Sequence, residues 1–305
     1  MKFTRCAILL MVGSSLLVAQ TPPQSAVAPQ IKQAQQLNSE GKQDDALAIL
    51  DPFLASDPKN YEANLTAGIV LDLKGDYSKA RTYLQHAVEL APQDRRVQAL
   101  RTTAVSYAFQ CDLPHVAEYE QQAYDAQLKG QKFTDAAGTA NELARIYLEC
   151  GNNPDAAKWY QTGYQAATRE TGLSEADRDL WNFRWENAKA RIAAREGKSK
   201  EADADVAAAK AILDKGKIPD QQRFYPYLTG YVAFYAGDYK AAIEQLQTAD
   251  QKDPFILVLL AQVYDKMGNQ SEAMKYYRQV LAINSHNPSN AFARPLAQKK
   301  LGTAS

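Results

Sequence analysis

A short frame of glycine and alanine recurs along the chain and constrains its fold more than any other feature. The segment Gly75–Ala80 (GDYSKA) returns as Gly237–Ala242 (GDYKAA). Counting these two, six segments share a Gly followed by an Ala five positions later: Gly41 and Ala46, Gly75 and Ala80, Gly151 and Ala156, Gly197 and Ala202, Gly237 and Ala242, Gly268 and Ala273. A Gly that ends one helix, followed by an Ala inside the next, predicts the turn of a helical hairpin. The chain is therefore expected to be an all-α repeat protein.

The spacing of the alanines gives the size of the repeat. Ala46 and Ala80 are 34 residues apart, and Ala80 and Ala156 are 76 apart, which leaves room for one degenerate unit between them. A second small residue precedes each Gly by seven positions: Ala34, Gly68, Ala144, Ala190, Gly230 and Ala261. Small residues at both places allow the two helices of a hairpin to approach closely.

Length and charge narrow the possibilities further. With 305 residues the chain exceeds the size at which one globular core keeps growing, and the repeats favour a solenoid over two domains. Lys plus Arg and Asp plus Glu both number 35, so the formal net charge is zero. Without a net positive charge the chain has no overall attraction for nucleic acid, and nucleic acid is not expected as a partner.

The N-terminus predicts export. Lys2 and Arg5 precede an apolar run from Cys6 to Ala19, which is shorter than the roughly 20 residues that span a bilayer. We expect a signal peptide over 1–20 and a disordered, Pro-rich linker over 21–30, and we expect the mature chain to be periplasmic or secreted. A retained membrane anchor is the alternative.

Two cysteines remain after removal of the signal peptide. Cys111 and Cys150 fall near the ends of first helices in adjacent repeats. Neighbouring parallel helices are about 8–10 Å apart, whereas a disulfide needs Cα atoms within about 7 Å. Although an oxidising compartment permits pairing, we expect two buried thiols rather than a disulfide.

The pattern resembles the tetratricopeptide repeat (TPR) family, whose unit is a hairpin of about 34 residues with small residues at fixed places and a Pro near its end. Pro58, Pro92 and Pro254 occupy the last of these positions. The resemblance implies a right-handed superhelical solenoid of about seven hairpins over 31–303, closed by a C-terminal capping helix at 289–301. Its repeats are expected at about 27–60, 61–94, 97–136, 137–170, 174–216, 223–253 and 254–288.

The fifth repeat carries a longer first helix. Ser174 and Asp177 are spaced as in a capped helix start. Trp181 and Trp185 then lie on one stripe with Ala188, at steps of four and three. We expect both Trp side chains to pack between repeats, and an exposed docking surface is the alternative.

The resemblance implies that partners bind on the concave side, at inward-facing positions of each first helix. The fourth and fifth repeats place polar side chains there: Asn141, Arg145, Arg184, Asn187, Arg191 and Arg195. The sixth repeat places aromatic side chains there: Phe224, Tyr227, Tyr231 and Tyr235. The Asn–Arg spacing of four residues recurs twice, which predicts a ladder that holds an extended, partly acidic chain. The alternatives are polar side chains that only solvate the groove or pair internally with Glu149 and Glu186, and aromatics that belong to the core.

No catalytic chemistry is indicated. The three His residues, His86, His115 and His286, are far apart in the sequence, and no phosphate loop, nucleophile elbow or paired-Cys motif is present. We therefore expect no enzyme, cofactor or metal. The leading hypothesis is an exported interaction scaffold that binds a segment of a partner protein in its groove. A cell-envelope carbohydrate-binding module and an unrecognised hydrolase are the alternatives.

Overall fold

The computed structural model describes residues 27–303, and this part of the chain contains helices and no strands. The first eight helices are α1 (Pro29–Ser39), α2 (Gln43–Ser56), α3 (Tyr61–Lys74), α4 (Tyr77–Leu90), α5 (Arg96–Ala108), α6 (Leu113–Lys129), α7 (Phe133–Glu149) and α8 (Asn153–Ala167). The others are α9 (Glu175–Arg195), α10 (Ser199–Asp214), the 3₁₀ helix η1 (Pro219–Phe224), α11 (Tyr225–Ala236), α12 (Tyr239–Thr248), α13 (Pro254–Lys266), α14 (Gln270–Leu281) and α15 (Pro288–Leu301).

The expected N-terminal segments lie largely outside the described residues. All of the signal peptide predicted over 1–20 does so, as does the linker up to residue 26. The predicted end of the linker was wrong, because α1 begins at Pro29. Proline suits the first turn of a helix, where its missing N–H leaves no hydrogen bond unmade.

The glycine frame builds its turn in the way the sequence indicates. Gly75 and Gly237 end α3 and α11 with φ of 100° and 82°, a left-handed conformation that side chains rarely adopt. The next residue caps the following helix. Asp76 accepts a hydrogen bond from the backbone N–H of Lys79 at 3.3 Å, and Asp238 accepts one from the backbone N–H of Ala241 at 3.0 Å, at the start of α12. One short sequence therefore both stops a helix and starts its partner.

The small residues let the two helices interlock. A Cβ atom added to Gly68 on α3 would lie 2.4 Å from Cγ of Leu84 on α4, which is closer than atoms can approach. Leu84 and Ala80 are completely buried in the same contact. The hairpins are thus held by a close approach that tolerates no larger residue at this position.

The third repeat departs from the frame, and its expected boundary was wrong. Cys111 takes the left-handed turn position with φ of 51°, where the other repeats have glycine. The helix that follows, α6, ends at Lys129 after 17 residues, and α7 begins at Phe133. Residues 133–136 therefore belong to the first helix of the fourth repeat and not to the third repeat.

The capped start of the long fifth-repeat helix is confirmed. The Ser174 hydroxyl accepts from the backbone N–H of Asp177 at 3.0 Å, and the Asp177 carboxylate accepts from the backbone N–H of Ser174 at 3.2 Å. Trp181, on this helix, is buried with Ala137 and Ala166 of the preceding repeat. Its packing between repeats is therefore as expected.

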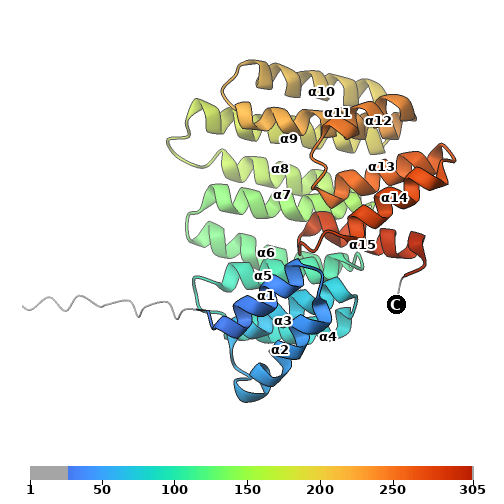
Figure 1. The fold of residues 1–305 in the computed structure, drawn as a ribbon. Helices are drawn as coiled ribbons and strands as arrows, with labels where there is room; N and C mark the ends of the chain where they lie inside the picture. The colour runs from blue at the N-terminus through green and yellow to red at the C-terminus, as the bar shows by residue number, and fades with distance from the viewer. Residues whose placement is uncertain (1–26, 304–305) are drawn as a thin grey trace, which may run out of the picture.

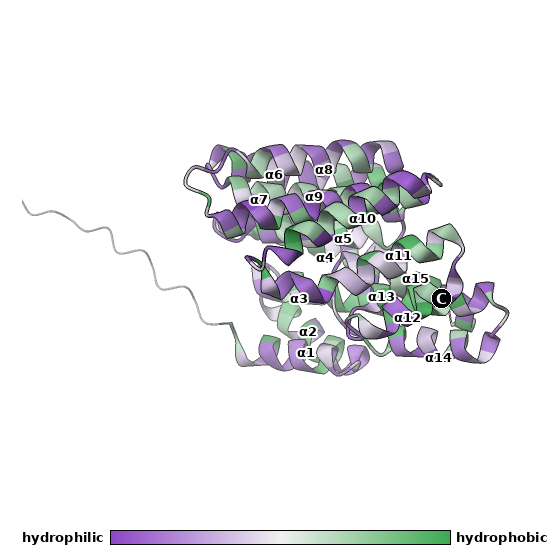
Figure 2. Ribbon diagram, turned by 90° about the horizontal axis from the view of Figure 1, so that it is seen from above, coloured by the Kyte–Doolittle hydropathy of each residue, from purple (hydrophilic) through white to green (hydrophobic). Residues whose placement is uncertain are grey.

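The hairpins stack into a solenoid that turns back on itself. In Figure 1, α3 to α10 rise as a ladder, and α11 to α15 descend beside it. From above, α13 and α15 lie towards the middle of the molecule, while α1 and α14 lie along one outer side (Figure 2). The position of α13 agrees with its sequence, because PFILVLLA is apolar on every side and all of it is buried.

The last helix does more than cap the open end of the stack, which corrects the sequence-based expectation. α15 packs on α13 and α14 and also contacts α5 and α7. The segment before it reaches the N-terminal repeats, because His286 Nε2 lies 2.8 Å from the carboxylate of Asp72 on α3. Asn284 accepts a hydrogen bond from Gln43 on α2 at 3.1 Å. The segment before α15 therefore joins the first and second hairpins across the superhelix.

The expectation of two free thiols was wrong, because Cys111 and Cys150 form a disulfide. Helix-axis spacing does not apply to this pair. Cys111 lies in the turn between α5 and α6, and Cys150 is the residue that ends α7. Both residues lie in turns just beyond the end of a helix, and their Cα atoms are 5.7 Å apart, within the usual range for a disulfide.

Candidate functional site

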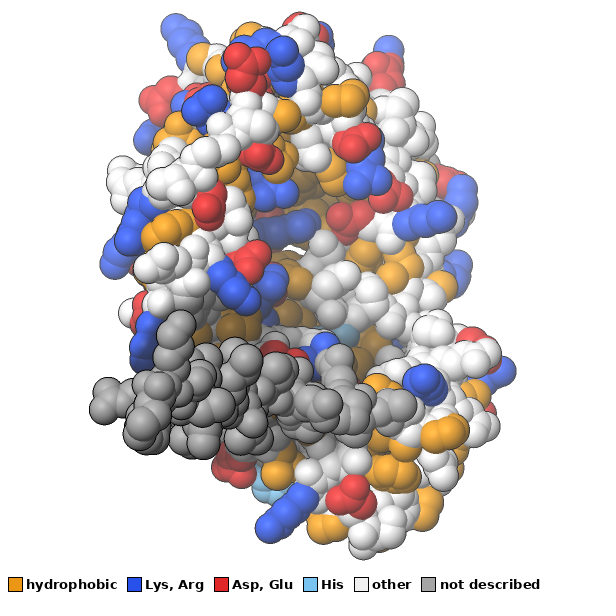
Figure 3. All heavy atoms as spheres, turned by 90° about the vertical axis from the view of Figure 1, so that its left-hand side faces the viewer, with side chains coloured by type: hydrophobic (Ala, Val, Ile, Leu, Met, Phe, Trp, Pro, Cys, Tyr) orange, Lys and Arg blue, Asp and Glu red, His pale blue; other side chains and the backbone are white. Residues whose placement is uncertain are grey.

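The groove of the solenoid contains a cavity of about 510 Å³ between α7, α9 and α11. Its volume lies within the range of ligand-binding pockets. Figure 3 shows the molecule hollowed near its centre, with Lys or Arg side chains deep in the hollow. The cavity is lined by Gly138, Asn141, Glu142, Arg145, Tyr160, Phe183, Arg184, Asn187, Arg191, Gln221, Phe224, Tyr227, Asn287, Pro288 and Ser289.

The structure brings most of the predicted site residues together here. Those that line the cavity are Asn141, Arg145, Arg184, Asn187, Arg191, Phe224 and Tyr227. Those that do not are Arg195, Tyr231 and Tyr235. Side chains four residues apart share a helix face, which is why the Asn–Arg pairs of α7 and α9 reach one cavity.

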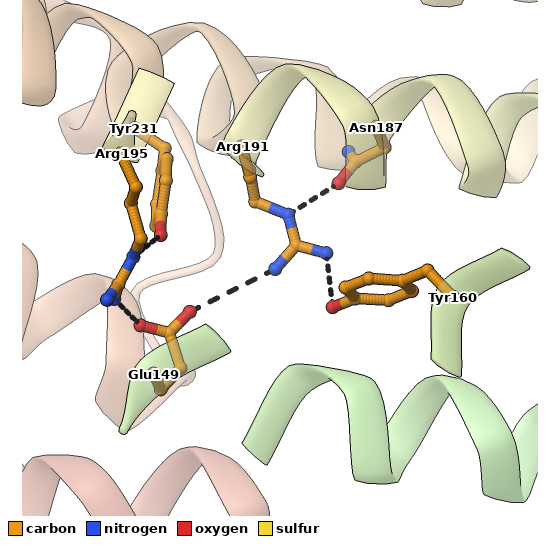
Figure 4. A network of polar contacts seen from close by, with 6 residues as sticks. All are labelled: Glu149, Tyr160, Asn187, Arg191, Arg195 and Tyr231. Atoms are coloured by element: carbon orange, nitrogen blue, oxygen red, sulfur yellow. Dashed lines mark hydrogen bonds and ion pairs between the residues drawn. The ribbon is translucent and has the colours of Figure 1, made fainter. Parts of the chain in front are cut away.

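A buried polar network forms the back of the site, with Glu149 at its centre (Figure 4). The Glu149 carboxylate, at the end of α7, accepts a hydrogen bond from Arg195 of α9 and lies 4.0 Å from Nη1 of Arg191. Arg195 also donates from Nε to the hydroxyl of Tyr231 on α11. The network therefore ties three successive first helices together.

Arg191 is committed to this network on several sides. Its Nε donates to the side-chain oxygen of Asn187 at 2.9 Å, and its Nη2 donates to the hydroxyl of Tyr160 at 2.8 Å. Only 6% of Arg191 and 9% of Asn187 is exposed. Asn187 and Arg191, one of the two Asn–Arg pairs of the expected ladder, are thus largely paired within the protein, as the internal-pairing alternative supposed. The acid near Arg191 is Glu149 and not Glu186, which pairs with Lys189.

The other Asn–Arg pair, Asn141 and Arg145 on α7, is not paired in this way with other described residues. Within residues 27–303, Arg145 makes no ion pair, and its buried Nε has no hydrogen-bond partner. Its guanidinium lies over the ring of Phe255, 5.1 Å from the centroid. Burial opposes its charge, but the electrostatic influence of Tyr227 and Asp253 leaves the pKa of Arg145 raised overall. The Arg145 guanidinium is therefore positioned by its contact with Phe255, and its N–H groups have no hydrogen-bond acceptor among the described residues.

Arg184, one repeat further on, also lacks an acidic partner within residues 27–303, but it is more exposed than Arg145. Its guanidinium lies over the ring of Trp181, 4.6 Å from the centroid, and it forms no ion pair with any described residue. Loss of hydration lowers the pKa of Arg184, since no nearby acid compensates. The guanidinium still carries its charge at any physiological pH.

The aromatic residues of the sixth repeat divide between core and cavity. Tyr231 is completely buried and packs against Tyr235 at 4.8 Å between ring centroids. Phe224 is 37% exposed at the cavity. The buried hydroxyl of Tyr227 makes no hydrogen bond within the described residues, and burial raises its pKa to about 12. That hydroxyl keeps its proton and is free to donate it.

Some lining residues have no counterpart in the sequence-based prediction. Tyr160 comes from α8, a second helix, and Asn287 and Pro288 come from the segment before α15. First-helix positions alone cannot reveal them. The same C-terminal segment also lines a cavity of about 1270 Å³ beside α5, α6 and α7, which shares Glu142, Asn287 and Pro288 with the first.

Other kinds of site are not seen in the described part of the chain. No group of three or more His, Cys, Asp or Glu side chains within residues 27–303 is placed to hold a metal ion. None of the helices described there has the length and apolar character to cross a membrane.

Comparisons with known proteins agree with this architecture. Two profiles described as tetratricopeptide repeat match residues 37–103 and 256–287. The crystal structure of the apo form of RapI aligns with a TM-score of 0.55 at 10% identity, covering 90% of this chain and 97% of that one. A tetratricopeptide repeat protein from Parabacteroides merdae aligns with a TM-score of 0.50 at 11% identity and the same coverage. At such identities the likeness shows the fold alone. No curated protein matches the sequence. Its repeated glycine frame, its stacked hairpins and these two profile matches show that the chain contains tetratricopeptide repeats.

Proposed function

We propose that this protein is a non-catalytic, exported scaffold that holds a segment of a partner protein in the cavity between α7, α9 and α11. The observation that carries the proposal is the convergence of seven predicted residues on one open cavity, six from the first helices α7, α9 and α11 and Phe224 from the end of η1: Asn141, Arg145, Arg184, Asn187, Arg191, Tyr227 and Phe224. Repeat solenoids use their concave surfaces for extended ligands. An exposed aromatic ring beside buried donors is typical of an interface anchor.

Export is supported by two separate features. Lys2, Arg5 and the apolar run that follows have the form of a signal peptide. The disulfide between Cys111 and Cys150 is of a kind that persists in oxidising compartments. Mass spectrometry of the N-terminus of the protein purified from its native cells tests this proposal. An intact Met1 on chains found in the cytoplasm contradicts it.

The groove is best tested by filling it without altering a charge. Gly138 lines the cavity, and a Cβ atom added there has no neighbour within 4 Å. Gly138→Leu therefore projects a side chain into the cavity from a helix that gains a better helix former. The matched control is Gln165→Leu, at an exposed helical position on α8 away from the cavity.

Partner capture is read by photo-crosslinking from the cavity mouth. A photoreactive phenylalanine at position 224 is expected to crosslink a protein that the same residue at exposed Met267 does not. Gly138→Leu should abolish that crosslink, and Gln165→Leu should preserve it. Crosslinks that survive Gly138→Leu unchanged place the partner elsewhere and contradict the proposal.

A further inference from the structure

The wall of the cavity between α7, α9 and α11 carries more positive than negative charge. Arg195 and Arg191 face Glu149, which is the acid of the network behind the cavity. Glu142 also lines the cavity, but it is ion-paired to Arg101 of α5. Among the described residues no acid forms an ion pair with the two other guanidiniums of the cavity wall, those of Arg145 and Arg184, although Asp253 is near enough to favour the charge of Arg145.

These two guanidiniums are positioned by aromatic rings instead of by acids. Arg145 lies over Phe255, and Arg184 lies over Trp181. Stacking contacts the flat face of a guanidinium and leaves its N–H edges free, which is a property that Lys does not share. The sequence has therefore fixed two cations in place while leaving their directional donors unused.

Neutral donors complete the set. The Tyr227 hydroxyl is buried without a partner and keeps its proton, and the amide of Asn141 lines the same cavity. Asn141 is itself held close to α8, because its side-chain oxygen lies 2.5 Å from the position that a Cβ atom on Gly163 would take. Unpaired buried donors are few in proteins and each needs an explanation, and here both groups line a cavity that a ligand could fill.

We infer that the cavity binds a carboxylate of the partner segment, held by Arg145 and Arg184 with Tyr227 and Asn141 as neutral donors. The inference rests on the proposed function, since the occupant is taken to be a protein segment. Guanidinium forks match carboxylates in a bidentate manner. Protein chains supply this group from Asp and Glu side chains and from the C-terminus. The site thus differs from the expected ladder, in which Asn187 and Arg191 were to make the same contacts as Asn141 and Arg145.

The test uses the purified mature chain and three synthetic peptides of equal length, with binding followed by isothermal titration. The first alternates Glu and Ala and has both ends blocked. The second replaces each Glu with Gln. The third is the Gln peptide with a free C-terminal carboxylate. Binding of the first but not the second identifies an acidic side chain as the ligand, and binding of the third but not the second identifies a chain terminus.

The double variant Arg145→Gln, Arg184→Gln is expected to bind the carboxylate peptides with at least tenfold lower affinity, because charge-assisted hydrogen bonds are stronger than neutral ones. The matched control is Arg169→Gln. Arg169 also stacks on an aromatic ring, 4.5 Å from the centroid of Phe133, and it is exposed like Arg184, but it lies outside the cavity. It should leave peptide affinity unchanged, and circular dichroism should show all three proteins equally helical.

Two results overturn the inference. One is equal binding of the Gln peptide and the carboxylate peptides, and the other is failure of both carboxylate peptides to bind. Neither result decides the scaffold function, because crosslinking from position 224 and its block by Gly138→Leu do not depend on the charge of the partner. Loss of that crosslink specificity would instead refute the scaffold function itself.

Discussion

The guanidinium of Arg294 on α15 donates from Nε to the backbone carbonyl of Leu73 on α3 over 2.8 Å, although 221 residues separate them. Its Nη1 donates to the carbonyls of Leu281 and Ile283 at 3.2 Å. Arg294 is only 9% exposed, and loss of hydration lowers its pKa. One side chain therefore satisfies backbone acceptors at the end of α14 and in the second hairpin at once, and it closes the solenoid.

Removing that closure should loosen both ends together. Arg294→Met keeps much of the aliphatic volume but leaves three carbonyls without their donor, and we expect a loss of about 2–3 kcal/mol of unfolding free energy. Hydrogen exchange should become faster at the C-terminal end of α3 as well as in α15. Arg278→Met, at an exposed position on α14, is the control. Unchanged exchange in α3 would show that the closure does not depend on this contact.

Closure is also where prediction from sequence reached its limit. The Gly–Ala frame describes how a helix meets its neighbours, because each hairpin buries its small residues against the next helix. The joining contacts come from Asn284, His286 and Arg294, which lie outside the frame. Nothing in a local repeat specifies which residues meet after the superhelix has turned.

The site could be predicted to a similar depth. Helical spacing placed Asn141 and Arg145 on the face that lines the cavity. It did not distinguish Arg145 from Arg191, because that difference depends on how far the side chains of Glu149 and Tyr160 reach. Periodicity gives the face of a helix, while pairing depends on contacts between helices.

The disulfide should stabilise the third and fourth repeats. Cys111 and Cys150 are 39 positions apart in the sequence, and loop entropy alone corresponds to about 3–4 kcal/mol. The double variant Cys111→Ala, Cys150→Ala is expected to lower the unfolding free energy, measured by urea titration, by that amount. Reduction of the wild-type protein should have the same effect and should leave the double variant unaltered. Equal stability of oxidised and reduced wild type would contradict this.

Glu149 should be the costliest acid of the buried network to remove. Its side chain is 3% exposed, so Glu149→Gln leaves Arg195 charged and unpaired in the interior. Breaking one partner of a buried pair costs about 3–5 kcal/mol. Replacing both with apolar residues, as in Glu149→Leu with Arg195→Met, should recover only part of the loss in urea unfolding, because buried Arg191 also faces Glu149 and keeps its charge. Glu196→Gln, which breaks an exposed pair with Lys198, should cost less than about 1 kcal/mol.

The buried carboxyl of Glu120 predicts a dependence on pH. Glu120 is completely buried on α6, and burial and then neighbouring Glu142 raise its pKa well above its usual value of 4.5. Above pH 4.5 the unfolded chain releases this proton while the folded chain keeps it, so this group makes stability fall as pH rises. Glu120→Gln should therefore raise the melting temperature at neutral pH, and the gain should shrink towards pH 4.5. The exposed control Glu118→Gln should show no such trend.

Two glycines should respond in opposite ways to the same substitution. Gly68→Ala forces a Cβ atom to within 2.4 Å of Leu84 Cγ and 3.1 Å of the Ala80 carbonyl oxygen, so the α3–α4 hairpin must separate. We expect it to cost about 1–3 kcal/mol, as overpacked cores do. Gly138→Ala meets no atom within 4 Å and improves a helix interior, so it should stabilise by about 0.5–1 kcal/mol. Thermal unfolding of the two variants in parallel gives the comparison. A destabilised Gly138→Ala variant would indicate that the cavity wall does not have the space assigned to it, and the groove-filling test with Leu would lose its basis.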